Sequence, residues 1–350
     1  MRNRLLAAFA LTGLLLLSGC STDSAVPGQG VLTPPADPAQ RVEWPVYGGD
    51  EGAQRYSPLE EITPDNVASL ELAWEWTTGE REINDEQGNR IRPGSFEATP
   101  LMLADTLYLS TPYHHAVALD AVTGRELWRF DPGTTKVGAA GFGHPSFVHR
   151  GVAIWSAASE RRVFLNSREH LFALDAGTGL PIPSFGTGGR VDLTRELRWA
   201  VNPSHYGQSS PAVVWRDLVV VGSAVPDRLI QDRPPTGEVQ AFEVRTGRRV
   251  WQWNPIPRPG EPGGETWDPD ASGRIGHTNV WAPFSVDTAR GLLYLPVSTP
   301  TNDWYGDAGE APDSTVSRWS ASTRGPAGWC GTTRSCITDC GTTTLPPRRC

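Results

Sequence analysis

The chain has 350 residues, of which 37 are glycine, 31 are proline and 14 are tryptophan. Its 39 acidic side chains outnumber the 31 basic ones, which gives a formal net charge of −8 and argues against nucleic acid as a partner, because phosphate binding needs a positive surface. Outside the N-terminus, apolar and polar residues alternate rather than recur with a helical period, and turn residues are frequent. This pattern predicts an all-β protein of many short strands.

Residues 1–20 have the pattern of a bacterial export signal, with basic residues followed by an apolar run. The run ends in Leu-Ser-Gly-Cys at Cys20, which resembles a lipobox, although an ordinary signal peptide with an incidental cysteine is the alternative. We expect a lipid anchor on Cys20 that holds the mature protein to a bacterial membrane, facing the periplasm, and Ser21 favours the outer membrane. Residues 21–40, rich in Ser, Pro, Gly and Ala, predict a flexible tether.

One sequence pattern occurs three times within residues 41–306. Each copy is an apolar strand ending in Asp or Glu, then a Thr-Gly turn, then a second strand that usually closes with Trp. The copies are AVALDAVTGRELW (116–128), LFALDAGTGLPIP (171–183) and VQAFEVRTGRRVW (239–251). Their spacing is that of a large supersecondary unit, and repeats of this size and chemistry predict a β-propeller.

The repeat has a local physical explanation. The acidic residue can cap the turn through backbone N–H groups, and Gly124, Gly179 and Gly247 supply a positive φ. A hairpin of this kind cannot bury both of its faces alone and must stack on copies of itself. We therefore expect Trp128 and Trp251 to lie between neighbouring sheets.

Residues 307–350 lack aliphatic strands and hold four of the five cysteines. A disordered tail is one interpretation. A disulfide or metal knot is another, but the spacing of these cysteines is a poor zinc signature. They are Cys330, Cys336, Cys340 and Cys350.

The genetic code suggests a third interpretation of this tail. If each codon is read one base earlier, the permitted translations include LDARTGRLVWHYQVVHHGLWDYD, which contains a fourth copy of the repeat. We infer that the reading frame shifts between Gly306 and Arg318. In the present frame the tail is then expected to be unstructured.

Several longer motifs carry a family resemblance. They are WPVYGGDEGAQRYSPLEEITPDNV (44–67), LAWEWTTG (72–79), FEATPL (96–101), LYLSTP (107–112) and IPRPGEPGGETW (256–267). With them the chain resembles the quinoprotein dehydrogenases that use pyrroloquinoline quinone, closest to the sugar and glucose dehydrogenase branch. The resemblance implies an eight-bladed propeller with the cofactor and a calcium ion on its axis. This chain would supply only about half of the blades.

The resemblance also assigns the residues that would bind the cofactor, a planar quinone with three carboxylates. Glu97 and Arg150 match positions that contact it, and Arg150 would pair with a carboxylate. Ser209 or Ser210 matches a hydroxyl that hydrogen-bonds a carboxylate, with the choice between them open. Thr278 and Asn279 match a T-N motif whose threonine contacts the cofactor.

The chain departs from the family pattern at the calcium ligands and at the tryptophan that stacks on the cofactor ring. Asp227 stands where relatives carry an acidic calcium ligand, usually Glu, and Thr299 stands where they often carry Asn. A hydroxyl is a weaker ligand than an amide carbonyl, so the expected calcium site is weaker than that of relatives. The tryptophan that stacks on the ring in relatives would fall near Val280 or Trp281.

The substrate implied by the resemblance is a sugar or an alcohol. Alcohol-oxidising relatives carry a vicinal cysteine pair where this chain has His144 and Pro145, which favours a sugar or polyol. The chain has no haem attachment motif, so electrons would pass to an external acceptor, either a membrane quinone or a cytochrome. His114 and His115 are expected to be solvated side chains on a turn rather than metal ligands.

The catalytic base of the family is the aspartate of a W-D step in the string HHxLWDYD. In this chain that step falls at Gly341 and Thr342, so no catalytic residue is present in this frame, and we expect the chain to be inactive. A function from another class is the alternative: a non-catalytic propeller lipoprotein that acts as a scaffold in outer-membrane assembly. A scaffold has no need for the combination of Glu97, Arg150, Asp227 and the T-N motif at 278–279, so their joint presence favours the dehydrogenase.

Overall fold

The computed structural model describes residues 42–334 except for residues 51, 86–87, 89, 138–146, 226–233, 262–263, 265–275, 277, 299–316 and 323–327. The predicted export signal and tether therefore lie outside the described residues. Within the part of the chain that is described, no helix is long and apolar enough to cross a membrane.

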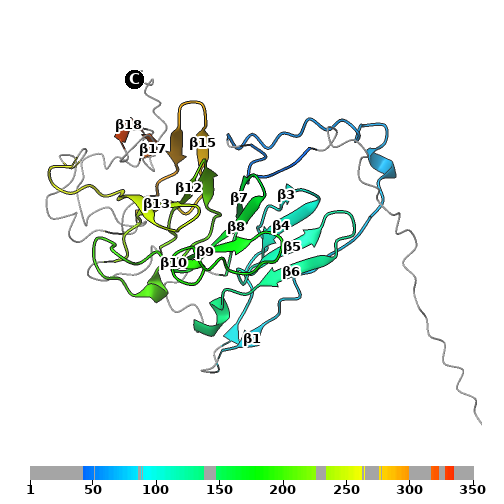
Figure 1. Ribbon diagram of the computed structural model, residues 1–350, viewed down its shortest axis with the longest axis horizontal. Coiled ribbons are helices and arrows are strands. Elements are labelled where there is room, and N and C mark those ends of the chain that lie inside the picture. The colour runs from blue at the N-terminus through cyan, green and yellow to red at the C-terminus, as the bar shows by residue number, and fades with distance from the viewer. Residues whose placement is uncertain are drawn as a thin grey trace, which may run out of the picture.

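Four antiparallel sheets of four strands make up most of the fold, and their strands follow one another in chain order (Figure 1). We number them blades 1 to 4. Blade 1 contains β3 (Leu101–Leu103), β4 (Thr106–Ser110), β5 (Ala116–Asp120) and β6 (Glu126–Phe130). Blade 2 contains β7 (Ala153–Ala157), β8 (Glu160–Ser167), β9 (His170–Asp175) and β10 (Arg190–Asp192). Blade 3 contains β11 (Val213–Trp215), β12 (Leu218–Val221), β13 (Val239–Glu243) and β14 (Arg249–Trp253). Blade 4 contains β15 (Ser285–Asp287), β16 (Leu292–Leu295), β17 (Ser317–Ser322) and β18 (Gly328–Arg334).

The remaining elements are short. A hairpin of β1 (Ile83–Asn84) and β2 (Arg90–Ile91) precedes blade 1, and 3-10 turns occur at η2 (Val67–Ser69), η3 (Thr134–Val137) and η4 (Pro203–His205). The described residues contain no α-helix. The predicted all-β class and the partial propeller are confirmed.

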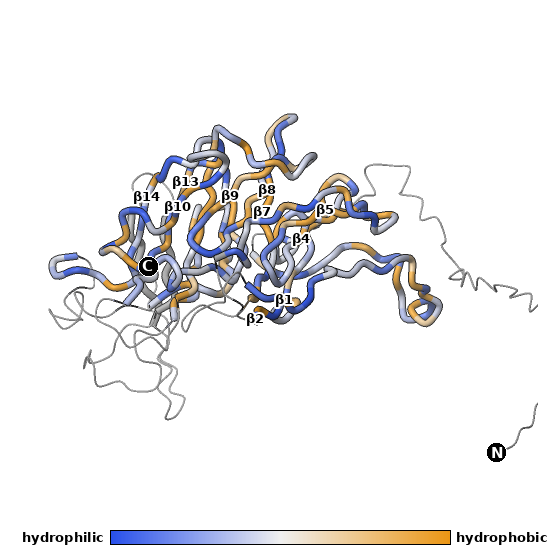
Figure 2. The backbone as a smooth tube through the Cα atoms, turned by 90° about the horizontal axis from the view of Figure 1, so that it is seen from below, coloured by the Kyte–Doolittle hydropathy of each residue, from blue (hydrophilic) through white to orange (hydrophobic). Residues whose placement is uncertain are grey.

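The apolar core lies in layers between successive blades, because alternate residues of each strand point to opposite faces. In β12, Val219 and Val221 pack toward blade 2, while Val220 packs toward blade 4. A further layer joins blades 1 and 2. The hydropathy colouring shows the apolar stretches along these strands (Figure 2).

The turns of the repeat have the predicted chemistry. The Oδ1 atom of Asp120 accepts hydrogen bonds from the backbone N–H groups of Val122 and Thr123, at 3.1 and 2.8 Å, and from the Thr123 hydroxyl at 2.8 Å. Asp175 caps the second turn in the same way. The three turn glycines have φ of 70°, 71° and 70°. The prediction about glycine is confirmed at all three turns, and backbone capping by the acidic side chain is confirmed at the first two. In the third turn Oε2 of Glu243 accepts from the Thr246 hydroxyl at 2.6 Å instead.

Trp128 lies between blades 1 and 2, as predicted. Its indole N–H donates to the carbonyl of Ala176 at 2.9 Å, and a Cβ on Gly179 would lie 2.5 Å from its ring. Trp251 is buried in the layer between blades 3 and 4. The closing Trp of the first copy therefore packs against the turn of the next blade.

Blades 2 and 3 are joined by an arginine instead of a tryptophan, because the second copy of the repeat ends in Pro-Ile-Pro. Arg162, which is 4% exposed, donates from Nη1 to the carbonyls of Val244 and Arg245, both at 2.9 Å. A buried guanidinium thus satisfies the turn of blade 3 from the neighbouring sheet.

The tail differs from expectation at two strands. Residues 317–322 and 328–334, expected to be unstructured, form β17 and β18, and β17 pairs with β16 from Leu292↔Ser322 to Leu295↔Trp319. Backbone pairing against an open strand edge needs no apolar side chains, which explains how a tail without aliphatic strands can add to blade 4. Cys330 falls within β18, and the other three tail cysteines lie outside the described residues.

Candidate functional site

The predicted cofactor residues precede the first strands of successive blades. Glu97 comes before β3, Arg150 before β7, the pair Ser209 and Ser210 before β11, and the T-N motif with Trp281 before β15. The first strands of the four blades face one another, because β3, β7, β11 and Phe284 next to β15 line a common cavity. Residues far apart in the sequence are therefore presented at one end of the strands.

Backbone hydrogen bonds tie these entry segments together. The Thr99 N–H donates to the carbonyl of Arg150, and the Arg150 N–H donates to the carbonyl of Ser209, each at 3.0 Å. Gly151, with φ of 146°, follows directly, and a Cβ there would lie 3.2 Å from the Thr99 carbonyl oxygen. The close approach leaves little room for a larger residue at Gly151.

The guanidinium of Arg150 lies at the centre of the cluster. Its Nη2 lies 2.8 Å from Oε2 of Glu97, and its Nη1 donates to the Ser209 carbonyl at 3.2 Å. Its Cζ lies 5.3 Å from the centre of the Trp281 ring, a cation–π arrangement. Four predicted site residues, Glu97, Arg150, Ser209 and Ser210, are thus brought together with Trp281.

The two serines hold the tryptophan. Both hydroxyls donate to the Trp281 carbonyl, Ser209 at 3.2 Å and Ser210 at 2.6 Å. The Trp281 side chain is 44% exposed, whereas Val280 is 2% exposed. Of the two positions considered for a ring platform, Trp281 therefore presents its ring and Val280 belongs to the core.

Thr278 and Asn279 lie on the same segment as Trp281 and are buried. The Asn279 N–H donates to the Ser298 hydroxyl at 3.0 Å, which fixes the segment against the residues after β16. Gly237 is required beside it, because a Cβ there would lie 1.7 Å from the Thr278 carbonyl oxygen. Among the residues that the structure describes, the Thr278 hydroxyl has no hydrogen-bond partner. A buried hydroxyl of this kind fits a site that awaits a polar ligand.

Five sequence-predicted positions fall outside the described residues: Cys20, His144, Asp227, Thr299 and Thr342. Among the residues that are described, no group of three or more His, Cys, Asp or Glu side chains could hold a metal ion. The calcium site stays a prediction.

Sequence reasoning missed a buried polar group behind the Arg150 cluster. It contains Ser110 and Asn166 at the ends of β4 and β8, together with His149, Gln208 and His114. The expectation of a solvated His114 is wrong: it is 2% exposed, and its Nδ1 lies 3.0 Å from the Ser167 hydroxyl. Polar residues at the ends of apolar strands were the available signal.

His149 is a base of this group whose pKa is perturbed by burial. Burial lowers its pKa from 6.5 to about 4, and the nearby Arg150 charge acts in the same direction, against the hydrogen bond to the Asn166 carbonyl. The imidazole is therefore neutral around pH 7.

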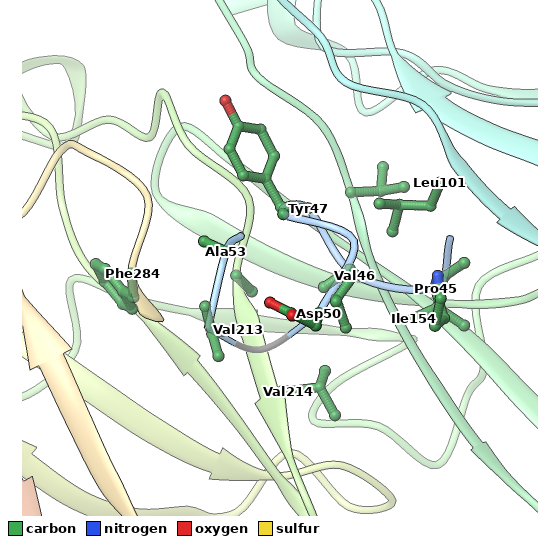
Figure 3. A pocket seen from close by; sticks show the side chains of 14 residues that line it. Pro45, Val46, Tyr47, Asp50, Ala53, Leu101, Ile154, Val213, Val214 and Phe284 are labelled. Atoms are coloured by element: carbon green, nitrogen blue, oxygen red, sulfur yellow. The ribbon is translucent and has the colours of Figure 1, made fainter. Parts of the chain in front are cut away.

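The cavity between the first strands is a separate feature (Figure 3). Its lining is mostly apolar, with Val46, Leu101, Ile154, Val213 and Phe284 around it, and Asp50 as its charged group. The residues that line it include no cationic side chain, which a carboxylated ligand requires, and their side-chain hydroxyl is that of Tyr47. The Arg150 cluster supplies a guanidinium and two serine hydroxyls. We therefore place the candidate site at the cluster.

The cluster suits a planar anion. A guanidinium supplies paired N–H donors for carboxylate, and the Trp281 ring offers an apolar face. On the segment that carries Trp281, the buried Thr278 hydroxyl has no partner within the described part of the chain. Arg150 and Trp281 already stack, so a flat aromatic ligand finds both a charge partner and a ring partner there.

Comparison with known proteins gives a consistent result. A family model for the β-propeller domain of glucose, ethanol and alcohol dehydrogenases, of the PQQ type, matches residues 44–317. The chain is 31% identical to the quinoprotein glucose dehydrogenase of Escherichia coli over 84% of its own length and 37% of that protein. It is 30% identical to the glycerol dehydrogenase large subunit of Gluconobacter oxydans, over 79% of this chain and 36% of that one.

Solved structures agree. A quinohemoprotein alcohol dehydrogenase of Pseudomonas putida matches with a TM-score of 0.65 and 25% identity, over 84% of this chain and 40% of that chain. A europium-containing methanol dehydrogenase matches in fold, with a TM-score of 0.61 and 21% identity over 81% of this chain and 48% of that one. The chain thus spans less than half of the length of these relatives.

Proposed function

The chain belongs to the β-propeller family of PQQ-dependent glucose, ethanol and alcohol dehydrogenases, and on that premise we propose that its Arg150 cluster holds pyrroloquinoline quinone in an enzyme that oxidises a sugar or alcohol. The observation that carries the proposal is the convergence of Arg150, Glu97 and Trp281 from three separate blades.

Each residue of the cluster has a distinct task in this proposal. Arg150 pairs with a carboxylate of the cofactor, and Glu97 orients the guanidinium through their 2.8 Å contact. Trp281 stacks on the ring, and its carbonyl is held by Ser209 and Ser210. When bound, such a quinone supplies a two-electron oxidant for a hydroxyl-bearing carbon.

The remaining groups of the site are proposed from the sequence. Asp227 and Thr299 would supply oxygen ligands to a calcium ion, with Asp shorter than the usual Glu and Thr weaker than the usual Asn. The position His144, in place of a cysteine pair, favours a sugar or polyol as substrate. The lipid anchor at Cys20 would place the enzyme at the periplasmic face, where a membrane quinone or a cytochrome takes the electrons.

We also propose that a frame shift places Thr342 where the family has its catalytic aspartate, and that the chain is inactive for this reason. The number of residues between β17 and β18 supports a fourth repeat, because it equals the number between β5 and β6 and between β13 and β14. In the shifted frame the genetic code permits Thr-Gly at residues 326–327, as in the other turns, where this chain has Pro326 and Ala327. Resequencing the gene across codons 300–350 tests this, and an unchanged frame would contradict it.

Cofactor binding is the direct test of the proposed site. We expect the purified 350-residue chain to bind pyrroloquinoline quinone in a calorimetric titration, and Arg150→Met to weaken binding by at least about tenfold, since a charge-assisted hydrogen bond contributes about 1.5–3 kcal/mol. Arg195→Met is the matched control, because Arg195 is 78% exposed. Absence of binding to the unsubstituted chain would contradict the site and favour a non-catalytic scaffold.

A further inference from the structure

His149 is a fully buried histidine one residue before Arg150. Its side chain bridges two strand ends: Nε2 lies 2.7 Å from the carbonyl of Asn166, near the end of β8, and Nδ1 lies 2.8 Å from the hydroxyl of Ser110 at the end of β4. The residue is 1% exposed. A side chain held from both ends in this way has one orientation.

The partners determine which nitrogen carries the proton. A carbonyl oxygen only accepts, so Nε2 carries a hydrogen and donates to Asn166. The N–H of Gly151 points at Nδ1 from 3.4 Å, so Nδ1 is an acceptor and also receives the Ser110 hydroxyl hydrogen. The imidazole is therefore neutral, with a donor toward blade 2 and an acceptor toward blade 1.

Asn166 extends this contact to the serine segment. Its side-chain amide donates to Oε1 of Gln208 at 2.9 Å and to the carbonyl of Ser210 at 2.7 Å, and its Oδ1 accepts from the N–H of Ala212 at 3.2 Å. One asparagine therefore fixes residues 208–212 through its side chain while its carbonyl fixes His149.

We propose that His149 is a positioning residue: through Asn166 it fixes the distance between Arg150 and the Ser209–Ser210 segment, and so sets the affinity for a polycarboxylated cofactor. The identity of that ligand rests on the proposed function, whereas the positioning rests on the contacts above. His149 itself stays behind the site, because both of its nitrogens are engaged within the protein.

Two substitutions at His149 separate the two halves of the bridge. Gln places an amide N–H near the position of Nε2, so His149→Gln keeps the donor to Asn166 and loses the acceptor for Ser110. Asn places its oxygen near Nδ1, so His149→Asn keeps the Ser110 contact and loses the contact to Asn166. A purely structural histidine would suffer at least as much from the Gln change, which removes the acceptor for the Ser110 hydroxyl and the Gly151 N–H, as from the Asn change, which removes only the donor to Asn166.

The experiment measures the dissociation constant of pyrroloquinoline quinone and the exchange rate of the Arg150 amide, whose N–H is bonded to Ser209. We expect His149→Asn to raise both by about tenfold, and His149→Gln to leave both within about twofold of the unsubstituted chain. The same two changes at His170, a histidine of β9 whose Nδ1 lies 3.3 Å from Oε1 of Glu169, serve as controls and should alter neither quantity.

Thermal unfolding of all variants shows whether each folds and how much stability it loses. Equal effects of His149→Asn and His149→Gln on affinity and on exchange, in proportion to lost stability, would overturn the positioning role. If the unsubstituted chain does not bind the quinone, the proposed function fails, and the exchange rate of the Arg150 amide alone tests the positioning role. Faster exchange in His149→Asn than in His149→Gln then supports that role, and equal exchange in the two variants overturns it.

Discussion

The indole of Trp74 packs against Gly124 with nearly the same geometry that joins blade 1 to blade 2. A Cβ on Gly124 would lie 2.4 Å from Cε3 of Trp74, and a Cβ on Gly179 would lie 2.5 Å from Cε3 of Trp128. In both pairs the glycine follows the Thr of the repeat turn. The turn glycine is therefore required for two reasons: its φ is positive and an aromatic ring occupies the space of a side chain.

The double requirement predicts a large effect of Gly179→Ala. The methyl group would meet the Trp128 ring and would also force alanine to a φ of 71°. We expect a loss of about 3 kcal/mol in the free energy of unfolding, measured by urea denaturation. Gly188→Ala is the matched control, because Gly188 has φ of 62° and nothing within 4 Å of its added Cβ. It should lose only about 1 kcal/mol, and equal losses would show that the ring contact is unimportant.

Arg162 gives a second prediction about the joints between blades. Replacing Arg162 by Met removes the hydrogen-bond donor of the Val244 and Arg245 carbonyls, at a site where Arg162 itself is buried. We expect a loss of about 3 kcal/mol in unfolding free energy. Arg161→Met, on the exposed face of the same strand, should change it by less than about 0.5 kcal/mol. Similar losses in the two variants would contradict the role of Arg162.

His149 predicts a pH dependence of stability. Its pKa is about 4 in the folded chain and 6.5 ordinarily, so between these values the unfolded chain binds a proton that the folded chain does not. The stabilisation is therefore complete above pH 6.5 and falls as the pH decreases to about 4, by about 3 kcal/mol in total. Urea denaturation at pH 7.5 and 4.5 measures the fall.

Carboxylates titrate in part of the same range, so the comparison needs a variant. His149→Gln has no titrating group at this position and should lose about 2–3 kcal/mol less than the unsubstituted chain between pH 7.5 and 4.5. Parallel pH profiles for the two proteins would show that His149 is not the group responsible.

Trp281 gives a prediction about the proposed site. Trp281→Ala removes the exposed ring that faces Arg150 and should weaken binding of pyrroloquinoline quinone by about tenfold, while Trp281→Phe should retain most of the affinity. Tyr294→Ala is the control, since Tyr294 on β16 is 42% exposed, close to the 44% of Trp281. Fluorescence titration gives the dissociation constants, and equal affinity in all three variants would contradict the platform.

The repeat could be predicted because its physics is local. Asp120, Thr123 and Gly124 form one turn within a few residues, and the alternating strands on either side require burial of both faces. By contrast, the Arg162 contact joins residues more than eighty positions apart, and nothing near Arg162 in the sequence indicates it. The burial of His114 was missed for the same reason: its neighbours in space come from blade 2.

The sequence by itself determined the all-β class, the turn chemistry and the identity of Glu97 and Arg150 as candidates, because turns, strand periodicity and motifs depend on residues close along the chain. Only the tertiary structure decided that Arg150 contacts Glu97 and Trp281 together, that the two serines hold the Trp281 carbonyl, and that Asn166 and His149 lie behind them. These contacts join entry segments of different blades, and their geometry is fixed by how the sheets pack, which no local pattern encodes.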